Sequence, residues 1–513
     1  MVSGDPGNPQ VRRQGIAEVL RRSAARFPAK TALVFGERSW TYEELLGAAE
    51  VAASDLVSGG VQPGDRVAVL GRNSDSYLIA WLATQLVAAV HVPVNFMLNA
   101  REVGYIVEHS GAVLALADED LYTTLEQGVR DNGSAPRLGR LELPSGTAPS
   151  RAGVCAISAE TIAQIAYTSG TESAPKGAML SHGGLQAQYV SCMVAGEYSP
   201  NDVIVHALPL YHCAQMHCFM MPALALGATS VLLPAPAPAE VVRAVIDHGA
   251  TSFFAPPTVW ISLLAHPDFQ PENVGTLTKA YYGASIMPVQ TVRSLLERLP
   301  GIRLWNYYGQ TELGPLATCL GPEEQLSKPG SAGRPVLNVE TRVVDEEMHD
   351  VAPGEVGEVV HRSPQVTSGY FNEPEKTQLA FEGGWFHSGD LATPDADGYI
   401  TIVDRKKDMI NSGGENVSSR EVEEVLYEHP AVAEVAVISV PDERWIEAVC
   451  AVVVLREDGS VTTEELRAYA REHLAGFKVP KTMHFVSELP KNPSGKILKR
   501  ELRDLHAGTV TPA

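Results

Sequence analysis

A hydroxyl-rich turn near residue 170 has the residue types of a phosphate-binding loop. In the segment AYTSGTESAPKGAMLSH it follows the apolar run IAQIAY and contains hydroxyls, glycines and a lysine, namely Thr168, Ser169, Gly170, Thr171, Lys176 and Gly177. Backbone N–H groups can approach an anion closely where no Cβ obstructs them, and an ammonium group adds positive charge. The turn therefore predicts a site for polyphosphate, with a solvated polar surface loop as the alternative.

The loop differs from the nucleotide-binding motif G-x-x-x-x-G-K-[ST]. Pro175 stands where that motif has a glycine before the lysine, and Gly177 stands where it has a serine or threonine after it. The loop sequence alone therefore does not identify the ligand, which has to be inferred from the other motifs of the chain.

The composition of the chain limits its partners. Lys and Arg number 40 and Asp and Glu number 61, which gives a formal net charge of −21 over 513 residues. A surface this acidic repels the phosphate backbone of nucleic acids. The six cysteines are scattered, unlike a disulfide framework, and the N-terminus lacks the apolar run of a secretory signal. We therefore expect a cytoplasmic protein that does not bind nucleic acid.

Short β-branched runs alternate with helical patterns along most of the chain. An example is RVAVLG followed by SYLIAWLATQLVAA, a rhythm typical of mixed or parallel sheets covered by helices. The most apolar stretch, residues 79–96, contains Gln85, His91 and Pro93. A buried helix followed by a strand fits it better than a transmembrane segment, and we expect none in the chain.

The length of the chain and a change in its residue composition predict two domains. The chain is too long for one core of about 100 to 200 residues. Beyond residue 403, charged residues and glycines gather in DRKKDMINSGGENVSSREVEEVLYEHP, and strand-like runs follow. We predict an α/β protein with a large N-terminal domain, residues 1–404, of mixed sheets with covering helices. A small, mobile α+β C-terminal domain, residues 405–513, is expected to follow.

Six motifs occur in an order that resembles the adenylate-forming enzymes, the superfamily of acyl- and aryl-CoA ligases, luciferases and adenylation domains. The motifs are TSGTESAPKG, LPLYH, YYGQTE, WFHSGDL, DRKKDMINSGGENV and PKNPSGKILKREL. The resemblance covers nearly the whole chain and extends to bacterial fatty acyl-CoA synthetases. It implies that a carboxylate attacks the α-phosphate of ATP to give acyl-AMP and pyrophosphate, and that the thiol of CoA then takes the acyl group.

The resemblance implies a role for each of several polar residues. Lys496 corresponds to the lysine that bridges the carboxylate and the α-phosphate, although a solvated lysine in a basic run is the alternative. Glu312 corresponds to the acid that binds Mg²⁺, and Thr311 to a hydroxyl that touches phosphate. Asp390 and Arg405 correspond to groups that hold the ribose. The adenine slot is implied at one ring and three backbone positions, namely Tyr308, Gly283, Ala284 and Ser285.

The resemblance also implies that the C-terminal domain rotates. Lys407 falls at the position of the family's hinge, where rotation replaces Lys496 with a segment that faces the pantetheine arm of CoA. Glycines suit that segment because a thin ligand can pass close to their backbone, and here the segment is Ser412, Gly413 and Gly414. A plain glycine turn is the alternative.

The segment after LPLYH bears on the substrate. His212 ends the motif at a position that lines the family's carboxylate channel, and no acid that could pair with an amino-acid substrate is nearby. The pattern H-C-x₃-H-C superficially resembles a metal site, but a structural zinc needs a second ligand pair, so packed residues are expected. Four apolar residues predict either a deformable wall for an acyl chain or ordinary helix core: Met216, Phe219, Met220 and Met221.

One departure from the family pattern is Glu172 in the phosphate loop, where a carboxylate facing triphosphate would be repelled. We expect its side chain to point away from the nucleotide. The leading hypothesis is an ATP- and Mg²⁺-dependent synthetase of medium- or long-chain fatty acyl-CoA. A ligase that loads a carrier protein's phosphopantetheine, and a catalytically silent relative that binds nucleotide or acyl ligand, are the alternatives.

Overall fold

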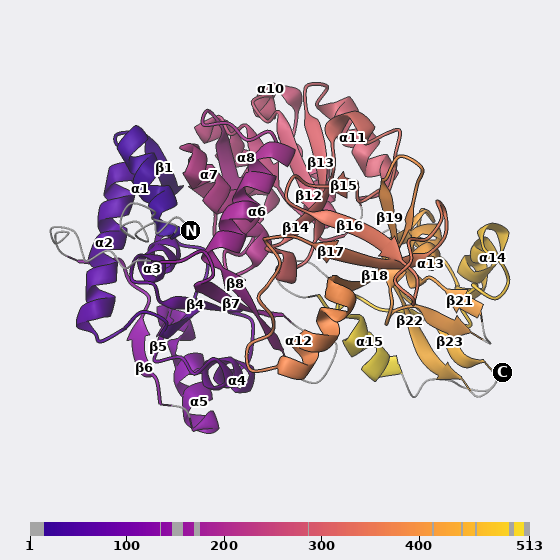
Figure 1. Cartoon of the computed structure of the whole chain (residues 1–513). Helices are drawn as coiled ribbons and strands as arrows, with labels where there is room; N and C mark the ends of the chain where they lie inside the picture. The colour runs from indigo at the N-terminus through magenta and orange to yellow at the C-terminus, as the bar shows by residue number, and fades with distance from the viewer. Residues whose placement is uncertain are drawn as a thin grey trace, which may run out of the picture. The chain divides into compact units, whose positions relative to one another are not determined.

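The computed structural model describes residues 15–133, 135–145, 157–168, 175–285, 287–412, 415–442, 445–456, 459–491 and 497–506. The chain forms two compact units, one made of Met1–Thr341 and His361–Phe386 and the other of Arg342–Val360 and His387–Ala513. Figure 1 shows their helices and strands, coloured by position along the chain. The predicted domain boundary at residues 404 and 405, and the hinge beside it, stay predictions.

A nine-stranded sheet forms one layer of the first unit. Its central strands run parallel, whereas β2 and β14 join it antiparallel. Its order is β15 (Arg334–Pro335), β14 (Leu316–Leu320), β13 (Arg303–Gly309), β12 (Lys279–Gly283), β11 (Ser252–Phe254), β9 (Val203–His206), β10 (Thr229–Leu232), β1 (Thr31–Phe35) and β2 (Arg38–Thr41).

A second, six-stranded sheet of the same unit is also mixed. Its strands are parallel except for the hairpin-like pair at one edge, β7 and β8. Its order is β6 (Arg137–Arg140), β5 (Leu114–Ala117), β3 (Arg66–Leu70), β4 (Val90–Val94), β7 (Ile162–Thr168) and β8 (Lys176–Ser181). These two sheets confirm the mixed sheets predicted for the large domain.

Helices follow the strands of both sheets, as the alternating sequence pattern predicts. Those of the first unit are α1 (Ala17–Arg26), α2 (Tyr42–Ser58), α3 (Asp75–Leu86), α4 (Ala100–Ser110), α5 (Tyr122–Asn132), α6 (His182–Ala195), α7 (Met221–Leu226), α8 (Pro238–His248), α9 (Pro257–Ala265), α10 (Pro271–Val274), α11 (Val289–Arg298) and α12 (Pro374–Ala380). A π-helical segment, η2 (Ala214–Met220), leads into α7.

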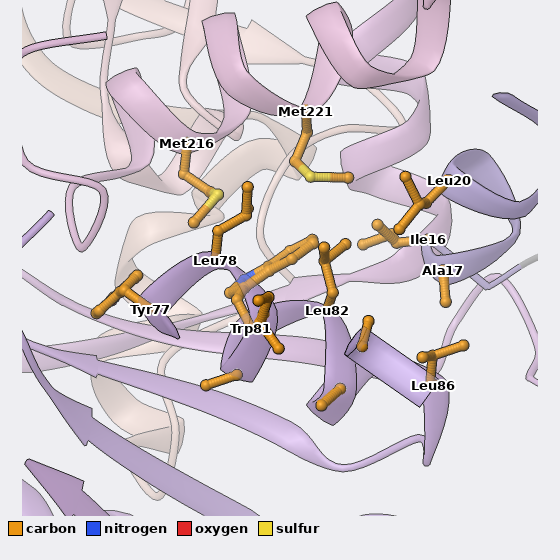
Figure 2. Close-up of a cluster of buried hydrophobic side chains, with 14 of the residues drawn as sticks. Ile16, Ala17, Leu20, Tyr77, Leu78, Trp81, Leu82, Leu86, Met216 and Met221 are labelled. Atoms are coloured by element: carbon orange, nitrogen blue, oxygen red, sulfur yellow. The ribbon is translucent and has the colours of Figure 1, made fainter. Parts of the chain in front are cut away.

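Helix α3 shows why the most apolar stretch of the sequence is buried. Ser74 caps its N-terminus by accepting a hydrogen bond from the backbone N–H of Tyr77 at 3.1 Å. The indole of Trp81 is fully buried, and Figure 2 shows it among Leu78, Leu82 and methionines of the η2–α7 region. The chain then continues into β4, which confirms the predicted helix followed by a strand.

The second unit contains most of a four-stranded sheet and all of a five-stranded sheet. The first has the order β16 (Glu340–Val344), β17 (Gly357–Arg362), β18 (Phe386–Pro394) and β19 (Ile400–Arg405). In the second, β23 (Ile446–Leu455) pairs with β20 (Ile410–Ser412), β22 (Val432–Asp442) and β24 (Thr482–Phe485), and β20 also pairs with β21 (Glu415–Val417). Its helices are α13 (Ser419–Tyr427), α14 (Thr463–His473) and α15 (Lys499–His506).

The strand order of the sheets and the helices between the strands confirm the predicted fold class. The larger unit has mixed sheets with helices, and the smaller unit has sheet and helix. Across the described residues, none of the helices combines the length and apolar character needed to cross a membrane.

Candidate active site

The two ends of the predicted phosphate loop are held in register by β7 and β8. These strands pair antiparallel, so Thr168 stands opposite Lys176, and the Thr168 hydroxyl donates to the Lys176 carbonyl at 3.4 Å. The predicted loop residues between them, Ser169, Gly170 and Thr171, lie outside the described residues, as does Glu172.

Tyr370 links the loop lysine to the predicted metal-binding acid. Glu312 lies in the short 3₁₀ turn after β13, is only 8% exposed, and accepts a hydrogen bond from the Tyr370 hydroxyl at 3.0 Å. The ammonium of Lys176 lies over the Tyr370 ring, 5.5 Å from its centroid. Tyr370 is not among the residues predicted from the sequence, because nothing in the segment SGYFNEP indicates that the chain returns to this place.

Backbone hydrogen bonds explain why Tyr370 returns. The backbone N–H of Thr367 donates to the Glu312 carbonyl at 2.6 Å, and that of Phe371 donates to the Gly177 carbonyl at 2.8 Å. Between them, Met179 exchanges backbone bonds with this segment, and Ala178 and Tyr370 form an antiparallel bridge. Residues 367–371 thus extend the edge of the six-stranded sheet at β8 and fix the aromatic side chain beside Glu312.

The surroundings of Glu312 suit a hard cation. Carboxylate oxygens are preferred Mg²⁺ ligands, and Mg²⁺ in such sites is held by one or two carboxylates together with substrate phosphates. Among the residues that the structure describes, no lysine or arginine pairs with Glu312, so its carboxylate is not already neutralised. Thr311, its neighbour in the turn, is half-buried.

The predicted adenine slot lies where two parallel strands end. Gly283 closes β12 and pairs with Tyr307 of β13, one residue before Tyr308. A Cβ on Gly283 would stand 2.5 Å from the Tyr307 carbonyl oxygen, so only glycine fits there. Ala284 then takes a φ of +65° and is exposed together with Ser285, while the Tyr308 ring is half-buried. Carboxyl ends of neighbouring parallel strands are common places for ligands to bind.

His212 lies two residues before the π-helical segment η2. It is half-buried, and its Nδ1 accepts a hydrogen bond from the backbone N–H of Ala214 at 3.2 Å. The loop before it is held by Asn73, whose side chain donates to the Leu208 carbonyl at 2.9 Å and accepts from the Leu210 N–H at 2.8 Å. π-helical turns occur frequently at functional sites.

Two of the histidines and cysteines after LPLYH are hydrogen-bonded to buried side chains. His217 is bound by Tyr189 and Gln164, and Cys218 accepts from Gln188 at 3.5 Å. Burial lowers the pKa of His217 to about 3. Within the described ranges, no group of three or more His, Cys, Asp or Glu side chains is placed to hold a metal ion.

The two residues predicted to hold the ribose form an ion pair in the second unit. Asp390 of β18 stands opposite Arg405 of β19, and the guanidinium Nε lies 3.1 Å from the carboxylate. Asp390 is 5% exposed, and the pair places an acceptor carboxylate next to a donor guanidinium. The neighbouring Asp404 carboxylate accepts from the hydroxyl and backbone N–H of Ser419, both at 2.7 Å, at the start of α13.

The predicted hinge and pantetheine segment are described only in part. Partial burial, followed by the neighbouring Arg405 guanidinium, lowers the pKa of Lys407. Ser412 is buried and ends β20, whereas Gly413 and Gly414 lie outside the described residues. Lys496 also lies outside them, three residues before α15.

The structure thus groups the predicted residues by unit. In the first unit, Tyr370 connects Lys176 with Glu312, and the residues of the adenine slot share one sheet edge. In the second unit, Asp390 and Arg405 are in contact.

Two family descriptions match the chain. The AMP-binding enzyme family matches residues 20–371, and the AMP-binding enzyme C-terminal domain matches residues 421–496. The first match contains the first three of the six motifs, and the second ends inside the last one, at Lys496.

Relatives with known names match over nearly their full length. A feruloyl-CoA synthase of an Amycolatopsis species is 37% identical over 497 residues, which cover 96% of this chain and 99% of that protein. A long-chain-fatty-acid–CoA ligase of Bacillus subtilis is 32% identical, with 95% and 94% covered.

The fold agrees with a solved ATP complex. The ATP-bound MatB of Rhodopseudomonas palustris superposes with a TM-score of 0.89 at 28% identity and covers 96% of this chain and 100% of its own. The resemblance drawn from the six motifs is therefore confirmed. This chain belongs to the AMP-binding enzyme family and is an adenylate-forming acid–CoA ligase that uses ATP, Mg²⁺ and CoA.

Proposed function

We propose that this ligase activates an aromatic carboxylic acid and transfers it to CoA. The observation that carries the proposal is the 37% identity, over 96% of the chain, to a feruloyl-CoA synthase, whose named product bears an aromatic acyl group. The medium- or long-chain fatty acid predicted from the sequence is the second candidate, supported by the fatty-acid ligase relative at 32% identity.

The methionines after His212 give little support to a long acyl chain. Met216, Met220 and Met221 are at most 1% exposed and belong to the core around Trp81 (Figure 2). Phe219 stacks on Phe254 with ring centroids 4.4 Å apart. Of the two interpretations offered by the sequence, these contacts favour helix core over a deformable wall.

The residue before His212, which is predicted to line the carboxylate channel, belongs to an aromatic pair. Tyr211 precedes His212, and its ring meets that of Phe96 edge-on, with centroids 5.5 Å apart. Edge-to-face contacts of this kind contribute about 0.5–1.5 kcal/mol beyond the area they bury, so a substrate ring gains from such neighbours. This surrounding supports an aromatic acid.

In the first step of the proposed mechanism, a carboxylate attacks the α-phosphate of ATP. Both groups are anions, and several residues offset the repulsion between them. Lys176 and the loop backbone bind the terminal phosphates, Thr311 donates to a phosphate oxygen, and Lys496 bridges the attacking carboxylate and the α-phosphate. Positive charge and fixed donors at the developing charge stabilise such a transition state. Glu312 would hold Mg²⁺, which would supply positive charge to offset that of the phosphates.

The remaining residues orient the nucleotide and then admit the thiol. Tyr308 and the backbone from Gly283 to Ser285 hold adenine, and Asp390 with Arg405 holds the ribose. Rotation at Lys407 then exchanges Lys496 for the segment Ser412, Gly413 and Gly414, so that the CoA thiol attacks the acyl carbonyl and AMP leaves.

A carboxylic-acid panel tests this function. Acid-dependent pyrophosphate release is measured with cinnamic, benzoic and arylacetic acids and with C8 to C16 fatty acids, each with and without CoA. Higher kcat/KM on an aromatic acid supports the proposal, and higher kcat/KM on fatty acids replaces it with the second candidate. Holo-carrier protein in place of CoA separates the carrier-loading alternative. No release with any acid would leave a silent nucleotide-binding relative.

A further inference from the structure

A buried glutamine, Gln365, contacts the backbone of the turn that carries Thr311 and Glu312. Its amide nitrogen lies 2.9 Å from the carbonyl oxygen of Leu313 and 2.5 Å from that of Leu316. These two carbonyls stand where the 3₁₀ turn ends and where β14 begins. Gln365 is 2% exposed, and both leucines are at most 1% exposed. Losing a polar contact in such a place is costly, because water cannot replace it.

The orientation of the Gln365 amide follows from its partners. Backbone carbonyls only accept, so the N–H₂ group faces Leu313 and Leu316. The amide oxygen accepts from the Ser191 hydroxyl at 3.0 Å. Ser191 in turn accepts at 3.2 Å from the amide nitrogen of Asn338, which can only donate. Each group in this chain therefore has one role, and the Gln365 amide cannot turn over without losing its partners.

Helix α6 anchors the glutamine to the strand that follows the phosphate loop. Ser191 belongs to α6, and so does Gln188, whose amide oxygen lies 2.6 Å from the amide nitrogen of Gln365. Both α6 side chains are fully buried. The helix begins at His182, directly after β8, whose first residue is Lys176. A strand and the helix after it therefore connect the loop lysine, through Gln365, with the turn of the predicted metal-binding acid.

We propose that Gln365 is a positioning residue of the ligase, which fixes the turn that carries Thr311 and Glu312 for the binding of Mg²⁺·ATP. The proposal rests on the roles proposed above for Thr311 and Glu312. The segment that follows Gln365 contacts the same turn, because the backbone N–H of Thr367 donates to the Glu312 carbonyl at 2.6 Å. Gln365 adds the contacts on the other side of Glu312, where the chain leaves the turn.

A matched control lies at the other end of β14. Gln325 is 3% exposed, and its amide nitrogen lies 3.1 Å from the Leu320 carbonyl and 3.2 Å from that of Gly321. Its amide oxygen accepts from the Tyr282 hydroxyl at 2.7 Å. Like Gln365, it joins two backbone carbonyls to one hydroxyl, but the carbonyls stand where β14 ends. Its replacement should cost similar stability without moving the turn.

The test is the affinity of each full-length variant for a non-hydrolysable ATP analogue, measured by isothermal titration with and without Mg²⁺. Gln365→Met keeps the length of the side chain and removes the amide, so the affinity with Mg²⁺ is expected to fall about tenfold, the scale of one buried hydrogen bond. Without Mg²⁺ the loss should be less than about threefold, because the Glu312 carboxylate then has no metal to bind. Gln325→Met should stay within about twofold of wild type in both conditions. Equal losses in the two glutamine variants would overturn the proposal, as would a loss in Gln365→Met that does not depend on Mg²⁺.

A milder variant guards against misfolding. Ser191→Ala leaves the Gln365 amide in place but removes the hydroxyl that orients it, so the affinity with Mg²⁺ should fall about threefold. Ser230→Ala is its control, since that fully buried hydroxyl belongs to β10 and lies 3.1 Å from Nε2 of His206. Its affinity should equal that of wild type. Wild-type affinity in Ser191→Ala would contradict the proposal even if Gln365→Met does not fold.

Glu312→Gln separates the two levels of inference. If it abolishes the effect of Mg²⁺ on binding while Gln365→Met behaves like Gln325→Met, the role of Glu312 stands and that of Gln365 falls. An enzyme that releases no pyrophosphate with any acid, but shows the expected affinities, would defeat the proposed function and uphold the role of Gln365 in nucleotide binding.

Discussion

At the scale of single residues, the most informative side chain is Tyr370. Its hydroxyl donates to Glu312, and the Lys176 ammonium lies over its ring. One residue therefore contacts both the acid predicted to bind Mg²⁺ and the lysine predicted to bind phosphate. A hydrogen bond to a charged group contributes about 1.5–3 kcal/mol, enough to fix a carboxylate rotamer. We therefore expect Tyr370 to fix the carboxylate of Glu312, the residue predicted to bind Mg²⁺.

Replacing Tyr370 by phenylalanine tests this role. Tyr370→Phe keeps the ring under Lys176 but removes the donor to Glu312, so the affinity for Mg²⁺·ATP should fall about tenfold. Isothermal titration with a non-hydrolysable ATP analogue and Mg²⁺, alongside the Mg²⁺ dependence of pyrophosphate release, measures the change.

Tyr42→Phe is the control for the loss of a tyrosine hydroxyl. That hydroxyl is buried and donates to the Ala228 carbonyl at 2.6 Å, away from Glu312. Its removal should lower stability and leave nucleotide affinity unchanged. Wild-type affinity in Tyr370→Phe would show that Glu312 needs no such support.

At the scale of elements, helix α15 ties the end of the chain to the predicted hinge. Arg503 pairs with Asp408 at 2.5 Å, one residue after Lys407. Lys499 lies 2.8 Å from the carboxylate of Glu423 and donates to the Ser419 hydroxyl at 2.7 Å. The helix that directly follows the Lys496 segment is thus clamped to α13 and to the strand connection where rotation is predicted.

Loosening this clamp should impair the first half-reaction. Arg503→Gln removes the contact with Asp408 that anchors α15, the helix that follows Lys496 in the sequence. We expect adenylation to fall about tenfold and thioester formation from supplied acyl-AMP to fall less than twofold. Stopped-flow measurement of each half-reaction provides the comparison.

The same helix supplies its own control in Arg500. Its contact with Asp504 spans 3.9 Å, and both side chains are more than half exposed. Exposed pairs of this kind contribute little, so Arg500→Gln should leave both half-reactions unchanged. Equal behaviour of the two arginine variants would rule out the clamp.

At the scale of the whole molecule, the division into two units matches a reaction in two steps. Lys496→Ala should abolish adenylation, because the bridge between carboxylate and α-phosphate is lost, yet leave thioester formation from supplied acyl-AMP largely intact. Lys407→Pro should do the reverse, because proline fixes φ at the hinge. Rapid-quench assays measure each half-reaction separately in both variants. A parallel loss of both half-reactions in either variant would refute the assignment of Lys496 to adenylation and of Lys407 to the rotation before thioester formation.

Buried histidines predict an acid limit to the stability of the first unit. Burial lowers the pKa of His91, His206, His217 and His361 to about 3 each, below the unfolded value of about 6.5. A group whose folded pKa is depressed contributes fully above pH 6.5 and loses its contribution as pH falls toward 3. Each such histidine should lower the free energy of unfolding by about 1.4 kcal/mol per pH unit in that window.

His91→Leu isolates one of these contributions, since among the described residues the His91 ring forms one hydrogen bond, a long one to the Tyr77 hydroxyl at 3.4 Å. Urea unfolding between pH 7.5 and 5 should show a slope shallower by about one proton in this variant. His349, with a side chain 78% exposed, provides the control through His349→Gln, which should follow the wild-type curve. Parallel curves for wild type and His91→Leu would contradict the expectation.

The sequence by itself determined the family and the fold class, and it predicts the residues assigned to ATP. Those features are local: hydroxyls and glycines in one turn, alternating strand and helix patterns, and short motifs in a fixed order. Glu312, Thr311 and Asp390 were predicted in this way because each lies inside a motif.

Only the tertiary structure decided which side chains support them. Tyr370 reaches Glu312 across 58 positions of chain, and Gln365 reaches Leu313 across 52, through strand pairing and burial that no local pattern records. The same is true of the methionines after His212, whose core packing depends on Trp81 of a distant helix. Contacts of this kind arise when the fold brings separate elements together to bury apolar surface and pair polar groups, so they are properties of the assembled core and not of any segment.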